Sequence, residues 1–585
     1  MIAAMEKVLV AGRALDRRAV LEAIRRAGVV HVEPVERREM LALPAVREEL
    51  VLAGRALEIL EAIAVAAVAC PPEHTPPVVI ERVLALSAAL EDTKDRRQDL
   101  LRERQQAAPW GRLGSADLQA LLTAGVRIEF FTCPAGAAGA VQAEIRHFAG
   151  RVKDLEHWVA VSRGEIVIAA PALRVPIPDR DAAAIDEALD ELDAEQGRFR
   201  SDLAAMVPCG AELRQFRVRL QDQQRLLEVE SGLHDAGEIF VLKGWVPSRD
   251  ARGLAAALDG LTAPVGLRVS PPDEADQPPT RFENRTWCRP IENLYRLLGI
   301  FPGYRERDIS FLFLPALTVF TGFLIADAGY AAVALLALAL SYRPLVRRGT
   351  PGAVLNLSLI LFGGVFVFGA LTNTWFGESL LKLTPFDGAT ESSQNLLKQL
   401  CFLLGAVHLS LAHLLKIWGK PLHQSMLAEA GWVLFIWAML ALVNMLVLNT
   451  PAPPWMIPLF QVSLVMVLLF TAPSRNPLKA LGAGLGAIAL NAAAFLSDII
   501  SYIRLWAVGL AGGILAASFN QLAGDLPLVV MLLVLVPAHL LNLSLGLVAI
   551  FAHGVRLNLL EFSNHLGMEW SGREYQPFAA RTETP

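Results

Sequence analysis

The sequence lacks several features that mark common classes of soluble protein. Its five cysteines, Cys70, Cys133, Cys209, Cys288 and Cys401, show no CxxC or other ligand spacing, which argues against a zinc site or disulfide framework and fits a reduced compartment. No GxxxxGK[ST] motif is present, so we expect no P-loop for nucleotide hydrolysis. The net charge is −5 without a long basic block, which argues against nucleic acid as a partner.

Charged residues are also scarce in the second half of this 585-residue chain, which is 54% hydrophobic overall. Of the 53 Lys and Arg and the 58 Asp and Glu residues, only 24 lie in residues 309–585. Soluble proteins of this size are more polar. At the N-terminus, charges interrupt the apolar run of MIAAMEKVLVAGRALDRR too early for a signal peptide. We therefore predict a polar, cytoplasmic first half and a membrane-embedded second half.

The first half is predicted to form two small α/β lobes joined by helical arms. EKVLVAG, LDRRAVLEAIRRAG and VVHVEPV have the patterns of a strand, a helix and a strand. Apolar positions at steps of three and four predict the seam of a coiled coil; they are Ile185, Leu189, Leu192, Gln196, Phe199 and Leu203. The chain order of lobe, arm, lobe and arm implies antiparallel arms. The alternative is a single globular domain with long packed helices.

These patterns predict the domain boundaries. A cytoplasmic α+β domain spans residues 1–290, a linker spans 291–308, and an α-helical transmembrane domain spans 309–585. Within the first domain, the proximal lobe covers about 1–40 and 236–285, the arms about 45–107 and 181–235, and the distal lobe about 110–178.

The second half contains about eight hydrophobic spans, since roughly 20 apolar residues cross a bilayer. They lie near residues 309–325, 328–342, 352–377, 397–415, 428–449, 454–472, 480–522 and 526–566, with a break expected at Asp327 and Gly329. The last two are so long that they must tilt or extend past the bilayer. Lys and Arg concentrate in the loops on the side of the first half, so the positive-inside rule places both chain ends in the cytoplasm.

Each of the last two spans carries an arginine, Arg504 in SYIRLWAVG and Arg556 in FAHGVRLNLLEF. A central intramembrane Arg costs about 2.5–3.5 kcal/mol on insertion scales. Ser497 and Ser501 share a helical face with Arg504, as His553 does with Arg556. Small and polar residues around a cation indicate a closely packed partner or a wet crevice.

Structural roles compete with this interpretation. Arg504 has two such alternatives, an ion pair with Asp498 and snorkelling to the interface. Arg556 has Glu561 nearby and approaches the cytoplasmic helix end, and His553 fits either a supporting hydrogen bond or a proton relay. Other polar intramembrane residues are candidates that no spacing singles out; they are His408, His413, Glu429 and Gln461.

Several motifs resemble the membrane subunit I (subunit a) of rotary V/A-type ATPases. The most specific is SYIRLWAVGLAG; the others are SFLFLPALTVFTGFLIADAGYA, FAHGVRLNLLEF, YQPF, RAGVVHVEPV, LKGWVPS and PPTRFEN, so the resemblance spans essentially the whole chain. The chain departs from the family at ADAGYA, where Ala326 and Ala331 replace frequent glycines, and at RERDISFLF, where the acidic-proline entry is absent. These departures affect packing near the first spans and leave the arginine motif intact.

The resemblance implies that the long helix pair clasps a ring of proteolipid subunits, with Arg504 facing the ring carboxylate. A permanent cation within ~4–6 Å favours the ionised carboxylate, so the ion leaves as the site passes, and Arg blocks leakage between two offset half-channels because it keeps its proton. Arg556 would support the same carboxylate or channel water, and Glu561 would line the cytoplasmic half-channel. Along straight helices, Arg504 and Arg556 would lie about 16 Å apart in depth, unless Pro527 and Pro537 bend the second helix.

The resemblance also implies the partners. These are the proteolipid c-ring, the peripheral-stalk subunits, the top subunit of the central stalk and the lipid bilayer of the cell membrane; no cofactor or metal is implied. Two rivals remain at this point. One is a secondary transporter or channel with a cytoplasmic regulatory domain, which predicts internal repeats that we do not find; the other is a membrane-tethered coiled-coil scaffold.

Overall fold

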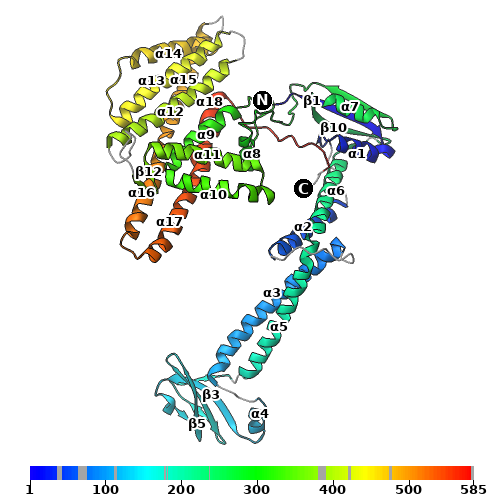
Figure 1. The fold of residues 1–585 in the computed structure, drawn as a ribbon, viewed down its shortest axis with the longest axis vertical. Coiled ribbons are helices and arrows are strands. Elements are labelled where there is room, and N and C mark those ends of the chain that lie inside the picture. The colour runs from blue at the N-terminus through cyan, green and yellow to red at the C-terminus, as the bar shows by residue number, and fades with distance from the viewer. Residues whose placement is uncertain are drawn as a thin grey trace. The chain divides into compact units, whose positions relative to one another are not determined.

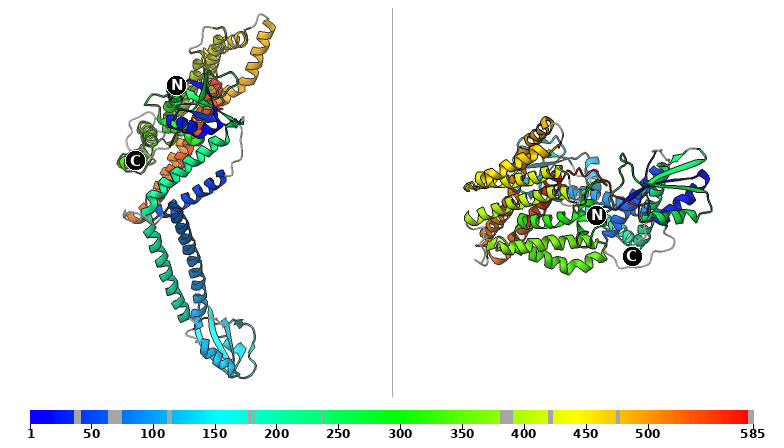
Figure 2. Two further views of the ribbon diagram at one scale, coloured as in Figure 1. Left: turned by 90° about the vertical axis from the view of Figure 1, so that its right-hand side faces the viewer. Right: turned by 90° about the horizontal axis from the view of Figure 1, so that it is seen from above.

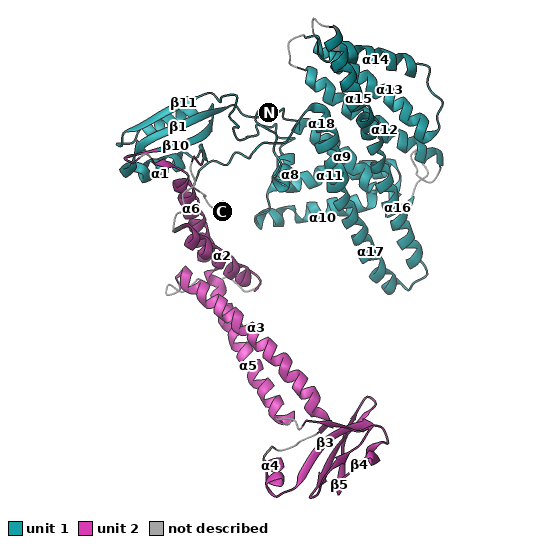
Figure 3. Cartoon of the chain, turned by 180° about the vertical axis from the view of Figure 1, so that it is seen from behind, with its two compact units in different colours: residues 1–33, 241–579 teal, residues 34–240, 580–585 magenta. Residues whose placement is uncertain are grey.

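The computed structural model describes residues 1–35, 42–63, 75–110, 115–176, 180, 182–235, 237–379, 391–418, 423–473 and 477–580. The chain divides into two compact units, residues 1–33 with 241–579 and residues 34–240 with 580–585 (Figure 3). The first unit contains both the proximal lobe and the apolar helices, although we predicted a domain boundary between them at residue 290.

The proximal lobe is a sheet covered by two helices (Figure 1). Its strands follow the order β11-β1-β10-β2, with bounds β1 Met5–Arg13, β2 His31–Glu33, β10 Ile239–Pro247 and β11 Val265–Ser270. The helices are α1 Arg17–Ala27 and α7 Ala251–Asp259. Helix α1 ends where Gly28 adopts φ +63°, a left-handed conformation that favours glycine. Trp245 is buried and donates its indole N–H to Glu33 Oε2 at 3.1 Å.

The second unit contains the helical arms and the distal lobe. Helices α3 (Pro76–Ala107) and α5 (Ala182–Met206) lie side by side (Figures 1 and 2), and α2 (Ala42–Glu61) packs on α6 (Gly210–Ser231). Four of the predicted seam residues are buried, Ile185, Leu189, Gln196 and Leu203. The distal sheet has the order β5-β6-β3-β8, formed by β3 Arg127–Pro134, β5 Ile145–Val152, β6 Leu155–Ser162 and β8 Leu173–Val175.

One cysteine departs from the expectation of reduced thiols. Cys209, at the junction of α5 and α6, is disulfide-bonded, whereas Cys133, Cys288 and Cys401 are free thiols. The sequence-based expectation of reduced thiols is therefore wrong at Cys209.

Six helical segments in the described residues are long and apolar enough to cross a membrane. They are α10 Ala328–Arg347, α11 Gly352–Leu371, α12 Glu391–Ile417, α13 Ser425–Leu448, and the two long segments Leu481–Ala523 and Leu528–Leu566. Two shorter apolar helices, α9 Ser310–Ile325 and α14 Met456–Phe470, cover the remaining predicted spans. The predicted break after α9 is confirmed, because Ala326 has φ +50° and Asp327 caps α10 by accepting the Tyr330 N–H.

Candidate functional site

The first long segment is irregular just before Arg504. It consists of α15 (Pro477–Ser501) and α16 (Ile503–Ala523), which meet at Tyr502. The Tyr502 N–H donates to the Ile499 carbonyl at 3.2 Å, an i to i−3 bond that tightens the turn. Arg504 Nε donates back to the Ser501 carbonyl at 3.0 Å. The irregularity therefore holds the guanidinium group against its own helix.

Two arginines converge on one buried carboxylate. Glu561 Oε1 lies 2.8 Å from Arg504 Nη2 and 3.7 Å from Arg556 Nε, and Ser501 Oγ lies 3.3 Å from the same oxygen. The Glu561 side chain is only 6% exposed, whereas that of Arg556 is half exposed. The cluster carries two positive charges and one negative charge, so one positive charge is uncompensated within it.

The expected separation in depth between the two arginines is wrong. Arg504 and Arg556 share Glu561 as an ion-pair partner, although straight helices placed them about 16 Å apart. The second long segment is not a regular helix, because α17 (Leu528–Ala549) contains Pro537 and continues as π-helical turns at Ile550–Val555 and Leu557–Phe562. Wide π turns rise less per residue, and the arginine side chains span the remaining distance.

The other predicted site residues have different surroundings. Ser501 contacts Glu561, but Ser497 is exposed. The Nδ1 atom of His553 is buried and has no hydrogen-bond partner among the described residues. Asp498 does not pair with Arg504 as the alternative required; it accepts a contact from His565 Nε2 at 3.0 Å.

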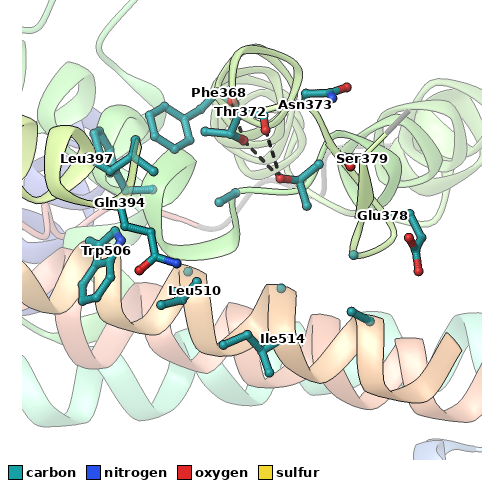
Figure 4. A pocket seen from close by; sticks show the side chains of 17 residues that line it. Phe368, Thr372, Asn373, Glu378, Ser379, Gln394, Leu397, Trp506, Leu510 and Ile514 are labelled. Atoms are coloured by element: carbon teal, nitrogen blue, oxygen red, sulfur yellow. Dashed lines mark hydrogen bonds between the residues drawn. The ribbon is translucent and has the colours of Figure 1, made fainter. Parts of the chain in front are cut away.

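A first cavity lies along α16 on the C-terminal side of Arg504. It has a volume of about 280 Å³, and α16 contributes Trp506, Leu510 and Ile514 (Figure 4). Opposite these lie polar side chains from the end of α11 and the segments that follow it, among them Thr372, Asn373, Glu378, Ser379 and Gln394. The cavity therefore has an apolar wall on α16, and its opposite side combines these polar side chains with the apolar side chains of Phe368 and Leu397.

A second cavity lies on the N-terminal side of Arg504. Its volume is about 340 Å³, and α15 contributes Asn491, Ala494, Phe495 and Asp498 to its lining. His413 and Lys416 of α12 and His565 of α18 (Ser563–Leu566) also line it. Sequence reasoning named His413 without a spacing argument and missed His565, because residues 152 positions apart have no periodic relation along the chain.

Comparisons with known proteins agree on one class. No family model matches the chain. It is 27% identical to V-type ATP synthase subunit I of Borreliella burgdorferi over 99% of both chains, and 27% identical to V-type ATP synthase subunit I 1 of Treponema pallidum over 99% of this chain and 100% of that one. A-type ATP synthase subunit I of Methanocaldococcus jannaschii is 22% identical over 68% of this chain and 64% of that one.

One solved structure aligns with part of this chain. The crystal structure of the cytoplasmic N-terminal domain of subunit I, a homologue of subunit a of V-ATPase, aligns with 45% of this chain and 99% of that one at 17% identity. Its TM-score of 0.23 is too low to establish a shared overall arrangement.

The chain thus combines apolar helices of spanning length with similarity over nearly its whole length to V-type ATP synthase subunits I. The chain is similar to subunit I of V-type and A-type ATP synthases, the family that its motifs resemble.

Proposed function

We propose that this chain is the stator membrane subunit that forms the ion half-channels against a proteolipid ring, with Arg504 facing the ring carboxylate. The observation that carries the proposal is the cluster of Arg504, Arg556 and Glu561, which the two longest apolar segments form together. Along the first of these segments, Arg504 lies between the residues that line one cavity and those that line the other.

The charge of the cluster suits one passing carboxylate. Glu561 compensates one of the two guanidinium groups, and a ring carboxylate would compensate the other. An unpaired cation at membrane depth is costly, so the cluster attracts an ionised carboxylate from the ring. Glu561 limits the strength of that attraction. Without Glu561, two uncompensated guanidinium groups would hold the ring carboxylate more tightly and slow its release.

Two cavities that flank Arg504 along the first long segment support the proposal of two half-channels. Residues 491–498 line one cavity and residues 506–517 contribute to the other, with Arg504 between them along the helix. A charge crossing directly from one cavity to the other would have to pass the guanidinium group. Arginine retains its proton in proteins, so such a barrier would persist throughout the cycle.

The second long segment leaves an apolar surface for a partner. Only 6% of the most apolar 18-residue stretch of Leu528–Leu566 is buried within the chain. Lipid covers part of such a surface, and the ring of apolar helices would cover the part that contains Arg556.

The remaining parts of the chain fit a stator. We infer that the arms and distal lobe dock the peripheral stalks, with a contact to the top subunit of the central stalk. Exposed apolar side chains on the distal lobe, among them Ile145, Phe148 and Leu173, are suited to such contacts. We place the chain in the cell membrane with both ends cytoplasmic, following the distribution of Lys and Arg in the loops.

ATP-driven ion uptake into vesicles that contain the assembled complex tests this function. We expect Arg504→Gln to abolish uptake while the ring and the ATPase head still copurify. Lys479→Gln is a matched control, because Lys479 is an exposed cation on the same long segment, and it should retain uptake. Normal uptake by an assembled Arg504→Gln complex would overturn the proposal and favour the rival transporter or scaffold.

A further inference from the structure

We propose that Glu429, His413, His565 and Asp498 form a proton relay in the second cavity, and that the coupling ion is therefore the proton rather than sodium. This inference rests on the proposed function and names the ion that it carries. We call these four residues the relay.

The relay is a continuous series of short polar contacts. Glu429 Oε2 lies 2.6 Å from His413 Nδ1, His413 Nε2 lies 3.0 Å from His565 Nδ1, and His565 Nε2 lies 3.0 Å from Asp498 Oδ2. Each distance is within hydrogen-bond range. Each of the four nitrogen atoms of the two imidazole rings therefore takes part in one of these contacts. The three contacts follow one another directly, with no other group between them.

Burial distinguishes the interior of the relay from its ends. The side chains of His413 and His565 are 4% and 5% exposed, whereas those of Glu429 and Asp498 are 27% and 25% exposed. Protons can therefore exchange with water at the two carboxylates, but between them they must pass through the rings. Asp498 precedes Arg504 by six residues, about 9 Å along a helix.

The number of protons in the relay permits conduction. Three contacts need three hydrogens, but two neutral imidazoles supply only one N–H each. The third hydrogen comes from a protonated carboxyl or a doubly protonated ring. When a proton enters at Glu429, His413 Nδ1 gains it and Nε2 passes its own proton to His565 Nδ1; His565 Nε2 then passes a proton to Asp498. No bond other than N–H and O–H changes, and rotation of the two rings, each carrying its N–H, returns the series to its starting arrangement once Asp498 has released its proton.

The same geometry does not suit sodium. A sodium ion prefers several oxygen ligands as other hard cations do, whereas the centre of the relay consists of two imidazoles in direct contact. Among the described residues, Lys416 is a further charged group beside the relay and lies 3.8 Å from Glu429 Oε1.

The test measures ATP-driven proton and sodium uptake by the assembled complex in vesicles. We expect proton uptake without added sodium, and a decrease of at least about tenfold for His413→Ala and for His565→Ala. His423→Ala is the matched control, because His423 is an exposed histidine that lines neither cavity; it should keep proton uptake within about twofold of native.

Chemical rescue separates conduction from packing. Added imidazole should restore proton uptake by His565→Ala, whereas pyrazole, which has the same shape but binds protons weakly, should not. Equal rescue by both compounds, or undiminished proton uptake by both histidine variants, would overturn the relay. Sodium-dependent uptake by the native complex would overturn the choice of ion and leave the role of Arg504 intact; normal uptake by Arg504→Gln would instead overturn the proposed function.

Discussion

At the scale of single residues, Glu561 is the centre of the candidate site. It is the most buried member of a group with two arginines and Ser501, and its Oε2 atom has no hydrogen-bond partner among the described residues. A buried carboxylate with one oxygen atom unbonded is able to exchange its partners. The proposed function requires such exchange, because the site would repeatedly bind and release a ring carboxylate.

Replacing Glu561 with glutamine should slow ion transport without preventing assembly. Glutamine keeps the shape but leaves both guanidinium groups uncompensated, so the ring carboxylate should bind more tightly. We expect ATP-driven uptake to fall by at least about tenfold, equivalent to roughly 1.4 kcal/mol in the barrier. Vesicle uptake measures the effect; an assembled variant with native uptake would show that Glu561 does not balance the arginines.

Ser501 and Ser497 provide a matched pair on one helix. Ser501→Ala removes a hydroxyl that lies 3.3 Å from Glu561 Oε1, and a hydrogen bond contributes about 0.5–1.5 kcal/mol, so uptake should fall roughly two- to tenfold. Ser497→Ala should leave uptake unchanged, because Ser497 is exposed. Equal effects in the two variants would contradict a specific role for the Ser501 hydroxyl.

At the scale of elements, the position of Arg504 depends on how closely α16 packs against α9. A Cβ atom on Gly509 would lie 2.2 Å from the Phe323 carbonyl oxygen, which is far inside van der Waals contact. Glycine at this position allows the two backbones to touch. The close contact between α16 and α9 therefore fixes the position of the turn of α16 that carries Arg504.

Gly509→Ala should therefore lower both stability and ion uptake. Overpacking costs about 1–3 kcal/mol, because the contact atom belongs to the backbone and cannot rotate away. Gly513→Ala, one turn further on the same helix, should be tolerated, since a Cβ there meets nothing within 4 Å. Thermal melting of the purified complex in detergent and vesicle uptake measure the two effects; similar melting temperatures for both variants would contradict close packing at Gly509.

At the scale of the whole molecule, the C-terminal tail joins the last apolar segment to the proximal lobe within the first unit. The Phe578 N–H donates to the Val30 carbonyl at 2.7 Å, and the Tyr575 hydroxyl donates to the Val29 carbonyl at 2.5 Å. Burial raises the pKa of Tyr575 to about 12, so its hydroxyl keeps the proton that it donates. The tail therefore connects the membrane helices to the lobe that precedes them in sequence.

Phe578→Ala should loosen this connection. The Phe578 side chain is 2% exposed, and truncation of a buried Phe costs about 3–5 kcal/mol. We expect the tail after residue 570 to become sensitive to limited proteolysis and the melting temperature to fall. Arg573→Ala is the control, because the Arg573 side chain is exposed and its backbone carbonyl still accepts from Thr280; equal cleavage of both variants would show that Phe578 does not anchor the tail.

The sequence by itself determined the division into polar and apolar halves, the break at Asp327 and the presence of a cation, Arg504, within an apolar segment. These follow from hydrophobic patterning and from the cost of a charge in an apolar helix, both of which are local along the chain. Tertiary structure alone decided which partners the charges have. Glu561 meets Arg504 across 57 residues and His413 meets His565 across 152, and the π turns that help align them leave no periodic signal in the sequence.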